Sequence, residues 1–287
     1  MTIRALADAR RSAGRRSVEE LVVDNGSADG SAEALAFACP HARVITLPDN
    51  RGFAGGVNAG IAASRGRYLF LLNSDAFAIG PALERLAGYL DEHPEVGVVA
   101  PALENEDGSL QNNAYRRFPS PLTLFFEFCL PLARLTHGRA LHPHNLPNRR
   151  FDRPRKIAHA MGAALLVRAE AISQAGPLDE RFFFYLEETE WQGRIASAGW
   201  EIHLEPASRV RHLGGASSGE TYAFASEHYL DSVTRFFDGA LSARAAIVSG
   251  AAISYLDAVV QGGFRADRER YRQRADAYRA VISRVAS

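Results

Sequence analysis

Two short segments of this 287-residue sequence place carboxylates and amides directly after strand-like runs. Asp24 and Asn25 follow a strand expected over Glu20–Val23, and Asp75 follows the apolar run Tyr68–Leu72. A carboxylate at a strand end can accept hydrogen bonds from a ligand, or hold a hard divalent cation together with a diphosphate. Neither segment is specific alone, because many strands end in aspartate.

The first segment, Val22–Ser31, also has an ordinary interpretation. A strand, a tight turn at Gly26 and Gly30, and a helix with Ser31 as its N-cap would form without any ligand. From these residues alone the ordinary interpretation is favoured.

A third segment, Asp49–Gly60, combines Gly52 at the start of a helix with further glycines and Asn58. Glycines that open a helix let backbone amides approach a phosphate. The segment has neither the Gly-Lys-Ser/Thr of a Walker loop nor a GxGxxG fingerprint, which argues against a nicotinamide dehydrogenase. Tight packing of the helix on a sheet explains the glycines equally well, and both interpretations can hold.

Strands and helices alternate over the first 110 residues. This order predicts a mostly parallel, doubly wound α/β sheet, in which ligands bind beyond the carboxyl ends of the strands. Tyr68–Leu72, as a continuous apolar run, is expected to be covered on both faces. The expected helices are Thr2–Ser12, Ser31–Ala38, Phe53–Ser64 and Pro81–Glu92, and the expected strands are Glu20–Val23, Val44–Leu47, Tyr68–Leu72 and Val96–Ala100.

The middle of the chain differs in composition. Leu122–Leu135 is rich in Phe and Leu, and is either an interfacial helix at a membrane or a helix packed on the sheet. Arg134–Lys156 is basic, and faces acidic groups or is a solvated loop. A strand over Met161–Val167, helices over 170–175 and 188–198, and strands over 201–204 and 209–212 follow. The tail from His228 is helical.

Composition excludes several classes of protein. The 33 basic and 33 acidic residues cancel, so nothing indicates nucleic acid as a partner. Cys39 and Cys129 give no disulfide framework, as expected in a reducing cytosol. The run Ala240–Val260 is interrupted by Arg244 and Asp257, so we expect a soluble or peripheral protein rather than a spanning one.

Taken in order, these segments resemble family 2 glycosyltransferases of the GT-A fold, particularly the bacterial rhamnosyltransferase-like branch. The resemblance covers residues 2 to about 218, and the ordered set is highly specific. It rests on the segments Val22–Ser31, Asp49–Gly60, Leu71–Ala76, Gly162–Arg168, Phe183–Trp191 and Val210–Ser217.

The resemblance implies a donor site and a metal site. Asp24 corresponds to the carboxylate that hydrogen-bonds the donor base, and Asp75 to the ligand of a Mg²⁺ or Mn²⁺ ion that bridges the diphosphate. His212 corresponds to the histidine that completes the metal site. Asn73 replaces the first carboxylate of the DxD-type motif, which leaves one negative charge fewer. The implied donor-binding residues are Asp24, Asn25, Gly52, Asn58, Asn73 and Ser74.

The resemblance also implies a catalytic pair. Glu187 and Glu188 match the family's "ED" pair, with Glu188 as the general base, and the neighbouring aromatic residues would desolvate it. Glu in place of Asp lengthens the reach by one methylene. Glu190 and Arg194 are spaced for a structural ion pair. Trp191 and Trp200 are more simply explained as core residues than as an acceptor platform, and His212, viewed alone, as an ordinary strand-end histidine.

The implied function is inverting, metal-dependent transfer of a sugar, with rhamnose the leading candidate, in cell-surface polysaccharide assembly. The donor would be a dTDP- or UDP-sugar and the acceptor a glycan or a polyprenyl-linked glycan. The protein would be cytoplasmic, with peripheral contact at the inner face of the plasma membrane. We expect a glycosyltransferase domain over 1–218 (donor half 1–110, acceptor and catalytic half 111–218) and a helical extension over 219–287.

One family feature is not found before the first helix. Members begin with a strand that is central in the sheet and contacts the donor base, whereas this sequence opens at Thr2 inside the following helix. The expectation is either a start site placed too far downstream or a truncation with an unpaired sheet edge. The alternative function is therefore a catalytically silent GT-A remnant or an interaction subunit.

Overall fold

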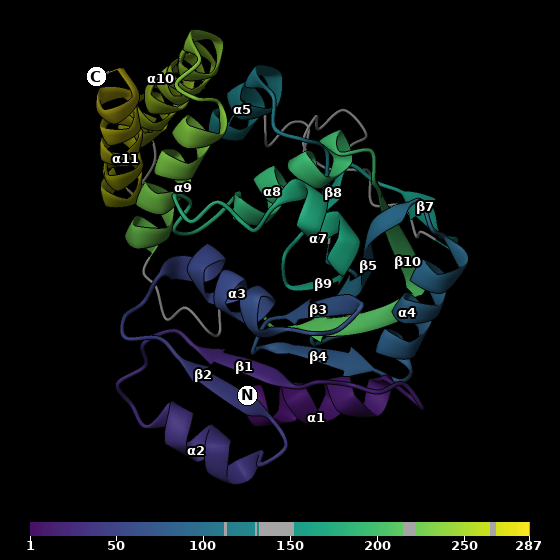
Figure 1. Cartoon of the computed structure of the whole chain (residues 1–287). Coiled ribbons are helices and arrows are strands. Elements are labelled where there is room, and N and C mark those ends of the chain that lie inside the picture. Colours follow the sequence, from purple (N-terminus) through teal and green to yellow (C-terminus); the bar gives the residue numbers. More distant parts are fainter. Residues whose placement is uncertain (112–113, 130, 132–151, 215–221, 265–267, 287) are drawn as a thin grey trace. The chain divides into compact units, whose positions relative to one another are not determined.

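The computed structural model describes residues 1–111, 114–129, 131, 152–214, 222–264 and 268–286 (Figure 1). The chain forms two compact units. The first comprises residues 1–115 and 150–229, and the second comprises residues 116–149 and 230–287. The expected division at residue 218 stays a prediction.

A six-stranded sheet forms the centre of the first unit. Along the sheet the order is β3, β9, β5, β10, β4, and β7 pairs with β10 at one end. Their bounds are Tyr68–Leu72 for β3, Ala164–Arg168 for β9, Val96–Glu104 for β5, Glu201–His212 for β10, Ala76–Ile79 for β4 and Arg155–Lys156 for β7.

The strand directions differ from the mostly parallel sheet expected from the sequence. Among the described residues, β5 and β10 are the only neighbouring strands of this sheet that pair in parallel. β9 lies antiparallel between β3 and β5, and β4 and β7 run antiparallel to β10. The sheet is mixed because β9, which comes from a segment beyond residue 150, enters antiparallel between β3 and β5, and because β4 and β7 pair antiparallel with β10. Helix–strand alternation does not reveal such an insertion.

The same insertion changes the environment of β3. Its bounds, Tyr68–Leu72, are those predicted, but it lies at the edge of the sheet and each of its residues is only half-buried. The expectation that β3 is covered on both faces was therefore wrong. The fully covered strand is β5, in which all nine residues are buried.

Two further strands form a separate parallel pair. β1, Leu21–Asp24, pairs residue by residue with β2, Arg43–Thr46. Among the described residues β1 pairs only with β2. Helices α1 (Thr2–Ser12), α2 (Ser31–Ala38) and α3 (Gly52–Ala63) accompany this pair.

Helices flank the main sheet, with α7 and α8 above its strands and α1 below them in Figure 1. The apolar face of α4 (Ala82–Glu92) packs Leu83, Leu86 and Leu90 against buried residues of β5 and β9. The Arg168 guanidinium donates to the carbonyls of Leu90, His93 and Val96, which satisfies the C-terminal end of α4. The other flanking helices are α7, Ala169–Ala175, and α8, Glu187–Ser197.

Short elements complete the first unit. β6 (Tyr115–Arg116) pairs with β8 (His159–Ala160). The two strands expected over 201–204 and 209–212 are one strand, β10, with a change of register between Glu205 and Arg209. Pro206 lies in that irregularity and has no N–H to donate to the ladder.

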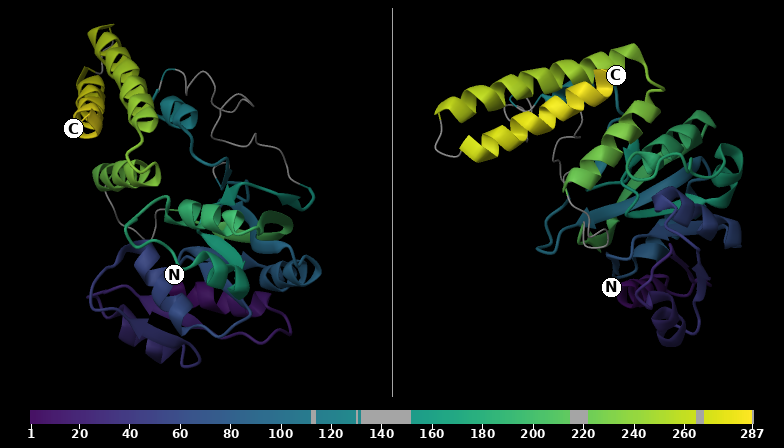
Figure 2. Two further views of the ribbon diagram at one scale, coloured as in Figure 1. Left: turned by 45° about the horizontal axis from the view of Figure 1, so that its top comes forward. Right: turned by 90° about the vertical axis from the view of Figure 1, so that its left-hand side faces the viewer.

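The second unit is helical. α5 (Pro121–Phe128), α10 (Leu241–Phe264) and α11 (Arg268–Ala286) pack together, and Figure 2 shows α10 beside α11. α9, Tyr222–Phe236, begins in the first unit and ends in the second. α5 packs on α10, where a Cβ at Gly250 would lie 2.7 Å from the Phe125 carbonyl oxygen. The Phe-rich segment thus contains a helix packed on another helix, and most of the basic segment 134–156 lies outside the described residues.

α10 has the length and composition of a membrane-spanning helix. Over Leu241–Val260 its mean hydropathy is 1.4, and a third of that window is buried within the protein. The two charges that argued against a span are both present, and the Arg244 guanidinium donates to the Val285 carbonyl of α11. Core helices of soluble proteins can have the same length and composition.

Candidate active site

The turn after β1 is fixed by Asn25. Its side-chain oxygen accepts the Arg51 N–H at 3.0 Å, and its amide nitrogen donates to the Gly52 carbonyl at 2.8 Å and to Asn50 Oδ1 at 3.0 Å. Asn25, predicted to bind the donor, thus uses both ends of its amide to fasten the β1 turn to the start of α3.

Asp24, the last residue of β1, has a different environment. It is 5% exposed, and its Oδ2 atom has no hydrogen-bond partner among the described residues. Its backbone carbonyl accepts the Leu47 N–H. A buried carboxylate oxygen without a donor is an acceptor available to a ligand, which fits the predicted contact with a nucleotide base.

Gly52 brings the start of α3 against a distant segment. Its φ of +70° favours glycine, and a Cβ there would lie 2.3 Å from the Phe183 carbonyl oxygen. The next residue, Phe53, donates its N–H to that same carbonyl at 3.1 Å. This glycine therefore permits close packing between the α3 start and the segment that leads into α8.

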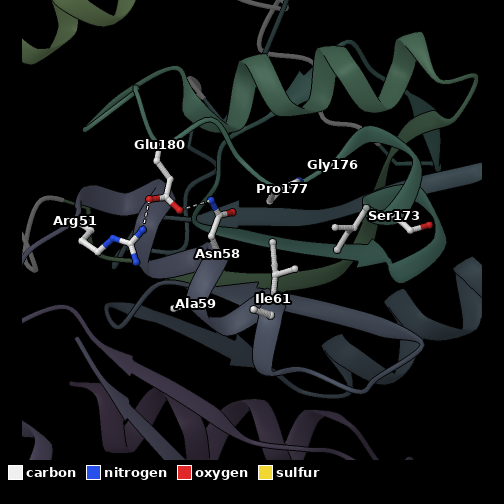
Figure 3. Close-up of a pocket in the computed structure, with 10 residues that line it drawn as sticks. Arg51, Asn58, Ala59, Ile61, Ser173, Gly176, Pro177 and Glu180 are labelled. Carbon is white, nitrogen blue, oxygen red and sulfur yellow. Dashed lines mark hydrogen bonds and ion pairs between the residues drawn. The ribbon is translucent and has the colours of Figure 1, made fainter. Parts of the chain in front are cut away.

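Asn58 connects the same two regions farther along α3 (Figure 3). Its amide accepts the Leu178 N–H at 2.9 Å and donates to the Leu178 carbonyl at 2.9 Å and to Glu180 Oε1 at 3.0 Å. Glu180 also pairs with Arg51, and the Asn58 hydrogen bond, together with Arg51, lowers the pKa of Glu180. Asn58 lines a pocket of about 550 Å³, and its amide is engaged within the protein.

Asp75 and His212 are brought together by strand register. His212, at the end of β10, pairs with Ala76 at the start of β4, so its ring reaches the preceding Asp75. The Asp75 carboxylate is 1% exposed, neither of its oxygens has a hydrogen-bond partner among the described residues, and Oδ1 lies 3.6 Å from His212 Nε2. Burial lowers the pKa of His212, whereas the nearby Asp75 opposes that shift.

Asn73 and Ser74 form the turn between β3 and β4, directly before Asp75. The Asn73 N–H donates to the Ala163 carbonyl at 3.0 Å, and its own carbonyl accepts the Ala76 N–H. Both side chains are half-buried. Because β3 pairs with β9, this turn lies beside the residues that precede Ala164.

The glutamate pair opens α8 after a strained turn. Tyr185 and Leu186 have φ values of +72° and +66°, which non-glycine residues rarely adopt and which tend to occur at functional sites. Glu187 is 5% exposed, and its Oε2 atom has no hydrogen-bond partner among the described residues. Burial, and then the charge of Glu188, raises the pKa of Glu187 well above its ordinary value. Sequence analysis expected this desolvation at Glu188, which is only half-buried.

Gly162 lies between the glutamate pair and the Asn73 turn. A Cβ at Gly162 would be 3.3 Å from both Cβ and Cγ of Glu188, and 3.4 Å from the Phe53 ring. Ala163, its neighbour, accepts the Asn73 N–H. The start of β9 therefore joins the Asp75 turn, the glutamate pair and the start of α3 in one site.

Comparison with known proteins agrees with this arrangement. A sequence profile described as "Glycosyl transferase family 2" matches residues 2–175, which is more than half of the chain. The chain belongs to glycosyl transferase family 2.

Individual relatives are glycosyltransferases of glycan assembly. The chain is 27% identical over 222 residues to an N-acetylglucosaminyl-diphospho-decaprenol L-rhamnosyltransferase of Mycobacterium tuberculosis, covering 71% of this chain and 69% of that protein. It is 26% identical over 214 residues to the Haloferax volcanii low-salt glycan biosynthesis hexosyltransferase Agl10, covering 67% of this chain and 61% of the relative. These relatives support a glycosyltransferase of the rhamnosyltransferase-like type.

Solved structures confirm the GT-A fold. GalNAc-T7 with UDP, GalNAc and Mn²⁺ aligns with a TM-score of 0.52 at 13% identity, over 93% of this chain and 50% of the other. The mannosyltransferase PcManGT of Pyrobaculum calidifontis with GDP-Man and Mn²⁺ gives the same TM-score at 14% identity, over 93% and 76%. At these identities the likeness concerns the fold alone.

Three residues that contact the predicted site residues or the elements that carry them are not marked by the sequence patterns. Gly162 was noted within a motif but not as a site residue. Gln192 is fully buried and exchanges two hydrogen bonds with the Ala160 backbone, which holds α8 on β8. Gln111 contacts His212 twice. No local pattern marks either glutamine, because each acts on backbone that is distant in sequence.

Two ordinary interpretations are confirmed. Trp191 is fully buried and donates its indole N–H to the Gly176 carbonyl, so it is a core residue. Glu190 pairs with Arg194 at 2.7 Å within α8, as its spacing predicted. Neither residue is free for the chemistry of the glycosyltransferase.

Proposed function

We propose that this glycosyltransferase transfers a sugar from a nucleotide-sugar to an acceptor hydroxyl with inversion, in the presence of a bound Mg²⁺ or Mn²⁺ ion. One observation carries the proposal. The Asp75 carboxylate is buried, neither of its oxygens has a hydrogen-bond partner in the described part of the chain, and Oδ1 lies 3.6 Å from His212 Nε2.

The Asp75–His212 pair fits a divalent cation. A buried carboxylate without donors is costly to maintain unless a cation or a proton compensates it. No group of three His, Cys, Asp or Glu residues forms a metal site among the described residues. The pair would therefore supply part of the ligand set, with the donor diphosphate and water supplying the rest. Such an ion neutralises the charge that develops on the leaving diphosphate.

The two glutamates of the pair have different protonation states. Burial and the charge of Glu188 favour the protonated form of Glu187, so the pair's negative charge belongs on Glu188. As the acceptor oxygen forms its bond to C1 of the sugar, Glu188 takes the proton of that hydroxyl. The bond from C1 to the diphosphate oxygen breaks on the opposite face, and the nucleoside diphosphate leaves with the electron pair.

The donor is proposed to be a dTDP- or UDP-sugar, with dTDP-rhamnose first among them. The Mycobacterium relative is named an L-rhamnosyltransferase, and GalNAc-T7 was solved with UDP. Asp24 lies at the end of β1 with a buried oxygen that has no hydrogen-bond partner within the described ranges, and it would accept a hydrogen bond from the base.

The acceptor is proposed to be a glycan, most simply one linked to a polyprenyl carrier. The name of the Mycobacterium relative includes a diphospho-decaprenol acceptor. In the second unit, α10 exposes a run of large apolar residues with Ile253, Leu256, Val259 and Val260 among them. Peripheral contact of this surface with the inner face of the plasma membrane would bring the enzyme to a lipid-linked substrate. Sedimentation of the protein with anionic vesicles tests this membrane contact. We expect the double variant Leu256→Ser, Val260→Ser to lose the sedimentation.

The central test is calorimetric titration of the folded protein with UDP and with dTDP, with and without Mn²⁺. Metal-dependent binding of either nucleotide, followed by transfer from the matching sugar donor, would support the proposal and narrow the base. Binding that is unchanged by Mn²⁺ or by Asp75→Ala would contradict the metal site.

A second candidate is a catalytically silent GT-A protein that serves as an interaction subunit. One observation favours it: among the described residues, β1 and β2 form no hydrogen bonds with the six-stranded sheet, although β1 ends in the residue proposed to bind the base. Folded protein that binds neither nucleotide would support this candidate.

A further inference from the structure

Gln111 contacts His212 through both ends of its side-chain amide. Its Nε2 atom lies 2.7 Å from the His212 carbonyl oxygen, and its Oε1 atom lies 3.1 Å from His212 Nδ1. Gln111 is itself held by its backbone, because its N–H donates to the Leu103 carbonyl of β5 at 2.9 Å. The Gln111 side chain thus contacts both the main chain and the ring of His212.

The two contacts fix the orientation of the amide. A carbonyl oxygen only accepts hydrogen bonds, so the atom facing it at 2.7 Å must be the donating NH₂ group. Oε1, which only accepts, must then face Nδ1. The reverse orientation would put two oxygens together at the shorter contact and cannot be favoured.

The orientation of the amide in turn selects the ring tautomer. An acceptor opposite Nδ1 requires a proton on Nδ1, so in the neutral ring Nε2 carries a lone pair. This Nε2 atom lies 3.6 Å from Oδ1 of Asp75, whose carboxylate has no hydrogen-bond partner among the described residues. Two electron-rich groups held this close in a buried place suit a cation between them.

We propose that Gln111 is a positioning residue that sets the tautomer and ring orientation of His212 for a divalent cation shared with Asp75. The inference rests on the proposed function in one respect, namely that this pair holds a cation. The partners that fix metal-binding histidines in this way are typically carboxylates, backbone carbonyls or water, and their loss commonly weakens metal affinity about 10–100-fold. Here the Gln111 amide also donates a hydrogen bond to the backbone carbonyl of the histidine that it orients.

A purely structural role is the competing explanation. The bond from Gln111 to the His212 carbonyl could simply secure the end of β10, and its loss would then lower stability without changing the ring. The two roles differ in the state of His212 in the metal-free protein, which can be measured directly.

The experiment uses the full chain with ¹⁵N-labelled histidine, free of metal. Long-range ¹H–¹⁵N correlation spectra report the tautomer of His212, assigned by the signal that is missing in His212→Ala. Titration with Mn²⁺, followed by electron paramagnetic resonance in the presence of UDP, reports cation affinity. The variants are Gln111→Met, which keeps the length but neither hydrogen bond, and Gln111→Glu, which keeps the acceptor for Nδ1–H but loses the hydrogen bond to the His212 carbonyl, because a carboxylate cannot donate.

The expected result is an Nδ1–H tautomer in the wild type and in Gln111→Glu, and its loss in Gln111→Met. Mn²⁺ affinity should fall about 10–100-fold in Gln111→Met and less in Gln111→Glu. An unchanged tautomer with unchanged Mn²⁺ affinity in folded Gln111→Met would overturn the inference. If the wild type binds no Mn²⁺, the proposed function fails and the cation role of Gln111 with it. The spectra of the metal-free protein would still show whether Gln111 sets the ring.

Discussion

Two sets of polar residues line the same end of this glycosyltransferase, and they differ in how their hydrogen bonds are satisfied. On the α3 side, the side-chain amides of Asn25 and Asn58 form hydrogen bonds with the backbone and side chains of neighbouring segments. On the other side, Asp75 and Glu187 are buried with oxygens that have no partner among the described residues. Satisfied groups hold the scaffold, whereas unsatisfied buried groups mark where a ligand, a cation or a proton belongs.

Asp75→Asn should have the largest effect on activity and should separate the two sets most clearly. Loss of the charge removes the proposed cation site, so transfer should fall by at least about 10³-fold, and Mn²⁺-dependent nucleotide affinity should fall with it. The free energy of unfolding of the metal-free protein should not decrease, because a buried, uncompensated charge has been removed. Transfer assays, calorimetry and denaturant unfolding test this.

The matched control is Asp107→Asn, a carboxylate in an exposed loop that is bonded to Ser109. It should leave transfer and Mn²⁺ dependence unchanged. Equal losses in both variants would mean that the buried environment of Asp75 does not set it apart.

Glu188→Gln should lower the rate of transfer by about 10²–10⁴-fold while nucleotide affinity stays near that of the wild type, because only the proton acceptor is lost. Single-turnover rates and calorimetric titration check the two quantities separately. Glu190→Gln, two residues along α8 and paired with Arg194, is the control and should retain transfer. Substantial turnover in Glu188→Gln would remove this residue from the role of base.

Asn58→Ala should behave as a scaffold change. The Leu178 backbone loses its partners, so the free energy of unfolding should fall by about 1–3 kcal/mol, while the affinity for nucleotide changes little. Asn105→Ala, which removes an exposed side-chain bond to Ser109, should cost less. A large loss of nucleotide affinity with unchanged stability would instead support the predicted role of Asn58 in donor binding.

Glu187→Gln should have the smallest effect, on the pH dependence of stability. The folded state raises the pKa of Glu187, so above the ordinary glutamate range the unfolded chain releases this proton while the folded protein holds it. The wild type therefore loses stability as the pH rises through that window, up to the raised pKa. Glutamine removes this loss, so the variant should gain relative stability from acidic to neutral pH. Denaturant unfolding at several pH values tests this, and a gain that grows on acidification would contradict the assignment.

Local structure was largely predictable, because local patterns determine it. α1, α2 and β3 have the predicted bounds, Thr2–Ser12, Ser31–Ala38 and Tyr68–Leu72. The position of β9 between β3 and β5 was not predictable, since strand order depends on pairing between distant segments. β4 was missed because its four residues follow Asp75 with no break in composition.

The charged residues of the site could be predicted from the sequence, whereas the residues that hydrogen-bond to them or to nearby backbone could not. Asp75 and His212 were paired through the family resemblance, and strand register does bring them together. The hydrogen bonds that Asn25 and Asn58 form within the protein could not be foreseen, because an asparagine that binds a ligand and one that holds a loop look alike in sequence. The contact of Gln111 with His212 could not be predicted for a related reason, since the two residues are 101 positions apart along the chain.

The second unit has a consequence for the order in which the chain can fold. α5 is synthesised before most of the catalytic residues of the first unit, yet its partner α10 starts at Leu241. Until the ribosome has added the chain through the end of α10 at Phe264, Leu124 and Cys129, both fully buried in the finished protein, lack the helix that α5 packs on. During that interval an apolar helix is exposed on the nascent chain, so slow translation or premature termination before α10 should favour aggregation or capture by chaperones.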